Sequence, residues 1–131
     1  MEKSKLDELC LKKRREVVKL IEVADVTRRV AEAVDRGDGV SAELLLSERE
    51  QPVRELSELE EGIRADIPSF SEADAIRVSE LLRGAEAETE EEKPLADQVA
   101  QFRRILSSVV TLDQQVSLRL GGNRSFYKKF R

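Results

Sequence analysis

Residues 95–120 read LADQVAQFRRILSSVVTLDQQVSLRL, and this stretch decides the fold class. Apolar side chains recur in it at alternating intervals of four and three residues, which places them along one face of an α-helix. The pattern predicts a long amphipathic helix whose seam packs against other helices. The residues of this seam are Leu95, Val99, Phe102, Leu106, Val109, Asp113, Val116 and Leu120. Asp113 is the one charged residue among them.

The sequence before this stretch predicts two more long helices. The same spacing predicts a first helix over about Lys3–Arg36, with Lys13 as a charged exception on its apolar face. The glycine turn that follows separates it from a second helix, which ends near Asp66 and has Ser41 as its N-cap. Pro52 lies inside the second helix, where a proline ring is expected to kink it or split it.

A short third helix and an acidic loop complete the expected elements. Ser71 and Asp74 have the spacing of a helix-capping box, and Gly84 is expected to end the short helix. Residues 85–92 contain five glutamates and almost nothing apolar, which indicates a solvated loop. Pro94 suits the first turn of the last helix.

The expected fold class is therefore all-α, an elongated antiparallel bundle of three long helices plus one short helix. The short glycine turn favours antiparallel packing of the first two helices, because connections of two to eight residues join neighbours in bundles. We expect a helical bundle domain over residues 1–122 and a separate tail over residues 123–131.

The composition excludes most enzyme classes. The 131 residues include no histidine and one cysteine, Cys10, so a transition-metal cage and a histidine-activated nucleophile are both excluded. We expect no catalytic residue, no metal and no cofactor. The 27 acidic residues leave a carboxylate–metal enzyme open as a distant alternative.

The same counts predict a cytoplasmic protein. A lone cysteine cannot form an intramolecular disulfide, and no apolar run approaches the roughly 20 residues needed to cross a bilayer. A net charge of −4 argues against nucleic-acid binding. The basic run at residues 12–15 is interpreted as a solvated helix face, and we expect neither a nucleic-acid partner nor direct membrane insertion.

Two local features have alternative interpretations. Arg36-Gly37-Asp38 matches an adhesive tripeptide, but its glycine coincides with the end of a helix and the turn interpretation is favoured. Asp113 either pairs with Arg or Lys of another helix and fixes the helix register, or marks a point where the seam is open to a partner helix. The register interpretation is favoured.

The tail has a composition of its own. Residues 119–131 contain five basic residues and no acid, together with Phe126, Tyr127 and Phe130. Aromatic anchors with basic residues are typical of a docking peptide. The alternative is that Phe126 and Phe130, four residues apart, fold back onto the bundle.

The layout resembles flagellar export chaperones of the FlgN/FliT type. The resemblance rests on the turn Ala33-Val34-Asp35-Arg36-Gly37-Asp38 and on the start of the second helix, Leu44-Leu45-Leu46-Ser47-Glu48-Arg49-Glu50. The chain departs from the family pattern at Pro52, in the acidic loop and in the basic tail. The resemblance implies a small cytosolic all-α protein without catalytic residues.

It also implies a function. Chaperones of this type hold helices of hook–filament junction or cap proteins, prevent premature assembly and deliver the client to the membrane export gate. By this resemblance the seam of the last helix binds the client helix, and Tyr127 with Phe126 and Phe130 docks at the gate. The alternative is a structural homo-oligomer in which the seam pairs with its own copy, so both a monomer and a homodimer are considered.

Overall fold

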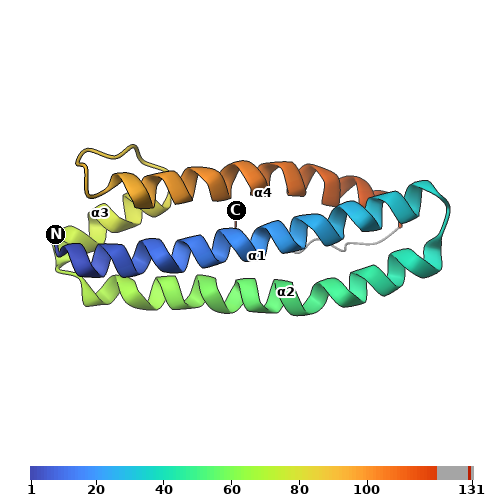
Figure 1. The fold of residues 1–131 in the computed structure, drawn as a ribbon, viewed down its shortest axis with the longest axis horizontal. Helices are drawn as coiled ribbons and strands as arrows, with labels where there is room; N and C mark the ends of the chain where they lie inside the picture. The colour runs from blue at the N-terminus through green and yellow to red at the C-terminus, as the bar shows by residue number, and fades with distance from the viewer. Residues whose placement is uncertain (121–129, 131) are drawn as a thin grey trace. The chain divides into compact units, whose positions relative to one another are not determined.

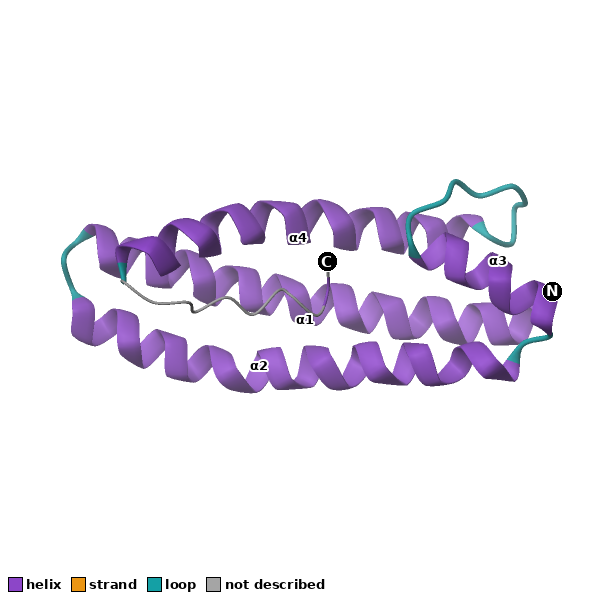
Figure 2. Ribbon diagram, turned by 180° about the vertical axis from the view of Figure 1, so that it is seen from behind, coloured by secondary structure: helices purple, strands orange, loops and turns teal. Residues whose placement is uncertain are grey.

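A computed structural model of the chain describes residues 1–120 and residue 130, and all of its regular structure in these residues is helical. The elements are α1 (Lys3–Asp35), α2 (Gly39–Asp66), the 3-10 turn η1 (Ile67–Ser69), α3 (Glu72–Leu82) and α4 (Lys93–Arg119) (Figure 1). No strand occurs in this part of the chain (Figure 2). The predicted all-α class, with three long helices and one short one, is confirmed. The predicted division at residues 122 and 123 lies outside the described residues.

The chain forms two compact units, and each unit combines segments that are distant in sequence. The first contains Met1–Val18 and Glu58–Arg103. Its core is formed by apolar residues of α1, α2, α3 and α4 with Phe70. The second contains Lys19–Ser57 and Arg104–Arg131, and its core takes residues from α1, α2 and α4. Burial of these apolar side chains is the main stabilising contribution to each unit.

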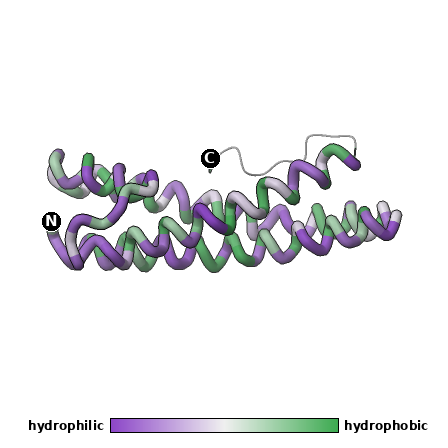
Figure 3. The backbone as a smooth tube through the Cα atoms, turned by 90° about the horizontal axis from the view of Figure 1, so that it is seen from above, coloured by the Kyte–Doolittle hydropathy of each residue, from purple (hydrophilic) through white to green (hydrophobic). Residues whose placement is uncertain are grey.

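The helices are amphipathic, as their sequence spacing predicts. Hydrophobic and hydrophilic residues are interleaved along each of them (Figure 3). In α4 the seam residues Val99, Phe102 and Val116 are 1%, 4% and 2% exposed. No helix in the described ranges is long and apolar enough to span a membrane.

The turn between α1 and α2 closes one helix and opens the next. Gly37 has a φ of +73°, and its N–H donates to the carbonyl of Val34. The N–H of Asp38 donates to the carbonyl of Ala33, which completes a Schellman motif. The Asp38 carboxylate then accepts from the N–H and the hydroxyl of Ser41. Asp38 therefore caps α2, and the prediction of Ser41 as the cap was wrong because an aspartate stood three residues earlier.

A side-chain cap at its start and a glycine at its end also delimit α3. The hydroxyl of Ser71 accepts from the N–H of Asp74, so the predicted cap is confirmed. Gly84, with a φ of +106°, closes a second Schellman motif: its N–H donates to Leu81, and the next N–H donates to Glu80. In α2 the helix continues through Pro52 as one element, so this proline does not split it.

Candidate functional site

The seam of α4 lies in the interior of the two units. Leu95, Val99 and Phe102 are buried in the first unit, and Leu106, Val109 and Val116 are buried in the second. Leu120 is partly buried against the core of the second unit. A client helix would reach these side chains only if α4 separated from its neighbours. Their role in partner binding stays a prediction.

The tail residues are mostly outside the described part of the chain. Phe126 and Tyr127 belong to the segment that the structure does not describe, and Phe130 is partly buried. The expected gate-docking role of these three aromatics, and its alternative of folding back, stay predictions.

Asp113 is fully buried and pairs with an arginine of another helix. Its Oδ1 accepts from Nη1 of Arg49 at 2.6 Å, and the same nitrogen donates to the hydroxyl of Thr27 at 3.0 Å. All three side chains are buried and lie in the second unit, on α4, α2 and α1 respectively. This geometry agrees with the interpretation of Asp113 as a residue that fixes helix register. A buried pair of this kind specifies which residues meet more than it adds stability.

A second buried polar cluster lies in the first unit and overturns one sequence interpretation. Lys13 was grouped with a solvated basic run, yet its side chain is 7% exposed. Its Nζ lies 2.5 Å from Oε1 of Glu16 and 3.9 Å from the centroid of the Phe102 ring. Lys13 occupies an apolar position of the α1 stripe, so it points inward. The ring face and the carboxylate replace the water that its ammonium group loses.

Glu16 is the least compensated charge of this cluster. Its side chain is fully buried, and its Oε2 has no hydrogen-bond donor among the described residues. The carboxyl of Glu60 on α2 faces it. Two ionised carboxylates repel each other, whereas one proton between them forms a hydrogen bond. Burial first, and then Glu60, raise the pKa of Glu16 to about 7, against the opposing effect of Lys13.

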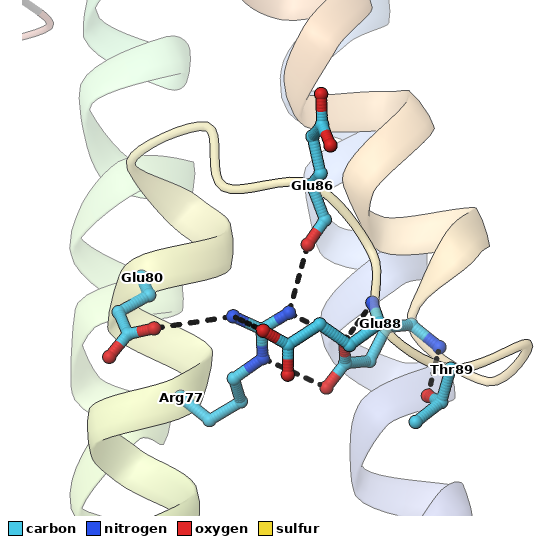
Figure 4. A network of polar contacts seen from close by, with 6 residues as sticks. Arg77, Glu80, Glu86, Glu88 and Thr89 are labelled. Atoms are coloured by element: carbon cyan, nitrogen blue, oxygen red, sulfur yellow. Dashed lines mark hydrogen bonds and ion pairs between the residues drawn. The ribbon is translucent and has the colours of Figure 1, made fainter.

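The acidic loop before α4 is held by one arginine. Arg77 on α3 donates to both carboxylate oxygens of Glu92, at 3.0 and 2.7 Å, and to the carbonyl of Glu86 at 2.9 Å (Figure 4). It also contacts the carboxylates of Glu80 and Glu88, at 3.2 and 3.8 Å. The loop was predicted to be solvated, which is wrong for Glu92, because this residue is 6% exposed.

Glu92 also organises the loop backbone. Its Oε1 accepts from the N–H of Glu88 at 2.9 Å, and its own N–H lies 3.3 Å from the hydroxyl of Thr89. The hydrogen bonds from Arg77, with a smaller contribution from the Glu88 N–H, lower the pKa of Glu92 to about 2. A bidentate arginine–carboxylate pair is a strong contact. It ties the loop to α3.

One open hollow lies in the second unit, between the end of α1 and the start of α2. It measures about 340 Å³. Its lining mixes two leucines with charged side chains of both signs: Arg29, Glu32, Arg36, Ser41, Leu44, Leu45 and Glu48. Leu44 is 61% exposed, and Val40, one turn earlier on α2, is 75% exposed. The hollow is thus an accessible groove with a mainly polar lining, in which Leu44 and Leu45 are the apolar part.

The hollow contains residues from the two stretches on which the family resemblance rests. Arg36, Leu44, Leu45 and Glu48 all belong to the two stretches that carry it. The signal that could have identified a surface was available, because Val40 and Leu44 are four residues apart and outside the apolar stripe of α2. No group of three or more acids or thiols that could hold a metal occurs in the described ranges.

Comparison with known proteins gives no relative: no family model matches the sequence, and neither the curated proteins nor the solved structures contain a significant match.

Proposed function

We propose that this chain is a helix-binding protein without catalytic activity, a cytoplasmic export chaperone or adaptor of the type that its sequence resembles. In this proposal the client is an amphipathic helix of a hook–filament junction or cap protein, the chaperone prevents its premature assembly, and the C-terminal tail takes the complex to the export gate. The three long helices are expected to form one elongated antiparallel bundle.

The observation that carries the proposal is the hollow of the second unit. Leu44 exposes 61% of its surface beside the partly buried Leu45, and removal of this exposed apolar surface from water by a partner is favourable. Arg29 and Arg36 provide positive charge at its border, and Glu32 and Glu48 provide negative charge. An amphipathic helix has the matching surface, an apolar face flanked by charges of both signs.

The hollow is a better candidate than the α4 seam. The seam residues are already covered by the chain's own helices, so a client at the seam would have to displace them, and the same holds for a homo-oligomer formed through the seam. Occupation of the hollow needs no such opening. We therefore place the client at α1 and α2, and we keep the seam as the support that holds these helices together.

Co-expression with hook–filament junction and cap proteins, followed by size-exclusion chromatography, tests the proposal. We expect a stable complex that Leu44→Glu weakens by about tenfold or more, because a charge would be buried in an apolar contact. The matched control is Leu118→Glu, which changes an exposed leucine of α4 outside the hollow. Absence of a complex with every client of this class, or equal loss from both variants, would contradict the proposal.

Deletion of residues 123–131 tests delivery separately. We expect the truncated chain to keep its helical content, its melting temperature and its client, and to lose delivery to the export gate. A large fall in the melting temperature would show instead that the tail belongs to the folded core.

A further inference from the structure

The outer face of the first half of α1 carries a symmetric arrangement of charges around an exposed leucine. Asp7, Glu8, Leu11, Arg14 and Arg15 are all exposed and belong to the first unit. Their spacing places them on one side of the helix. Leu11 is 47% exposed, and Val18, two turns after it on the same side, is 60% exposed.

These four charges have no ion-pair partner among residues 1–120 and 130. Most neighbouring basic residues of α1 have an acidic partner: Lys12 pairs with Asp66, and Lys13 with Glu16. In contrast, none of Asp7, Glu8, Arg14 and Arg15 makes an ion pair with another described residue, and the face has no internal role in the unit's core.

The order of the charges has a two-fold property. Glu8 lies three residues before Leu11 and Arg14 three residues after it, while Asp7 and Arg15 lie four residues before and after it. Reversal of the helix direction about Leu11 therefore brings each acidic residue to a height along the helix axis that a basic residue occupied before. A second α1 in antiparallel orientation brings Asp7 opposite Arg14 of the other copy and Glu8 opposite Arg15, because the members of each pair lie on the same flank of the helix face. The two leucines lie on the axis.

We propose that this face binds the same face of a second copy of the chain, antiparallel, about a two-fold axis at Leu11. The occupant is a second copy because the face is complementary to itself, which is the requirement of an isologous dimer contact. Four intermolecular ion pairs surround a small apolar centre formed by the two Leu11 side chains, and each Val18 lies two turns away from this centre. A parallel arrangement in the same register is disfavoured, since it would place like charges together.

The contact is small and rich in charge, so the dimer is weak. We expect one helix face of this length to bury less than the roughly 1,200 Å² at the lower limit of standard interfaces, and we therefore expect association in the micromolar range or above. Ion pairs at the surface are screened by salt, so the dimer should dissociate as the ionic strength rises from about 0.05 to 0.5 M. It uses the outer face of α1 in the first unit, and it is independent of the client hollow proposed above.

Sedimentation equilibrium of charge variants tests the proposal. In low salt, from about 5 to 500 µM, the wild type should rise towards twice its monomer mass of 14.8 kDa. Asp7→Lys/Glu8→Lys and Arg14→Glu/Arg15→Glu should each remain monomeric, because each places like charges across the axis. An equimolar mixture of these two variants should form a heterodimer, since all four cross pairs are then opposite in sign.

Two controls make the test specific. The fourfold variant with both changes keeps the net charge of −4 and should dimerise as the wild type does. Glu22→Lys/Asp25→Lys makes the same kind of charge reversal further along α1 and should leave the dimer intact. Circular dichroism checks that each variant remains helical. A wild type that stays monomeric throughout, a mixture that fails to associate, or a dimer lost on reversal of Glu22 and Asp25 would overturn the proposal.

Discussion

Replacement of Glu16 by glutamine should change how the stability of the protein depends on pH. Glu16 is buried between Lys13 and Glu60, and its pKa is raised from 4.5 to about 7. Glutamine has nearly the same shape as the protonated acid. Its carbonyl oxygen can still accept from Lys13, and its amide group can donate to Glu60, so Glu16→Gln imitates the protonated side chain at every pH.

The magnitude follows from the pKa difference. Below pH 4.5 Glu16 is protonated in both the folded and the unfolded chain, and the wild type resembles the variant. Between pH 4.5 and 7 the unfolded chain loses this proton while the folded chain keeps it, so the free energy of unfolding falls as the pH rises. A difference of about 2.5 units at 1.36 kcal/mol each amounts to about 3 kcal/mol. Above pH 7 the loss is complete.

Urea denaturation at several pH values between 4.5 and 8 measures this effect. The difference in unfolding free energy, Glu16→Gln minus wild type, should increase by about 3 kcal/mol over this range. Glu58→Gln, the same chemical change at an exposed position of α2, reports the effect of losing one charge without burial. A difference that stays constant within about 0.5 kcal/mol would refute the reasoning, because it would mean that the folded environment does not favour the neutral form of Glu16.

Three further predictions concern the buried Arg49–Asp113 ion pair, the contacts of Arg77 with the loop before α4, and two glycines. Asp113→Leu leaves the buried Arg49 without the carboxylate of Asp113 and should lower the free energy of unfolding, measured by urea denaturation, by about 3 kcal/mol. The double variant Asp113→Leu/Arg49→Met should regain most of this lost stability. Arg77→Met should destabilise the loop before α4, accelerate hydrogen exchange at the Glu88 amide, and expose residues 86–92 to a glutamate-specific protease. Unchanged cleavage would contradict the role of Arg77 in holding this loop. Gly62 lies inside α2 with open space around it, so Gly62→Ala should raise the free energy of unfolding by about 0.5–1 kcal/mol. Gly84 has a positive φ, and a Cβ there would lie 3.1 Å from the Arg103 side chain, so Gly84→Ala should lower it by more than about 1 kcal/mol. Thermal melts distinguish the two signs.

The secondary structure was predictable because its signals are local. Hydrophobic spacing determined the four helices, and Gly37, Gly84 and Ser71 determined where helices begin and end, since a positive φ or a capping hydroxyl acts within one turn of the chain. Asp38 was missed as a cap because only Ser41 was considered, and the backbone geometry shows that the Asp38 carboxylate accepts from Ser41.

The polar clusters were predictable only in part, because they depend on contacts across the sequence. The seam indicated that Asp113 needs a basic partner from another helix, but the choice of Arg49 depends on which turn of α2 faces it. Lys13 was recognised as an exception on an apolar face and was still interpreted with its basic neighbours. Its position in the stripe was the better guide, and the same spacing places Glu16 beside it three residues later.

Glu92 shows the limit of composition as a guide. It is one of five glutamates in a short segment, and nothing in its neighbours distinguishes it from Glu90 or Glu91. Only Arg77, fifteen residues earlier, makes it a buried residue. The hollow was predictable in part: Val40 and Leu44, four residues apart outside the apolar stripe of α2, indicate an exposed apolar surface, but the α1 residues that line the hollow beside them depend on the packing of the two helices.

The double role of Asp38 determines where this chain tolerates added sequence. Its N–H completes the end of α1 while its carboxylate starts α2, so the turn contains no spare residue. One inserted amino acid would rotate the start of α2 by about 100° relative to α1 and turn Leu46 and Arg49 away from the core. A fluorophore or affinity tag therefore belongs at Glu90 or Glu91, which are exposed in the loop before α4. A tag inserted in the turn between α1 and α2 would instead disrupt the packing of these two helices in the second unit.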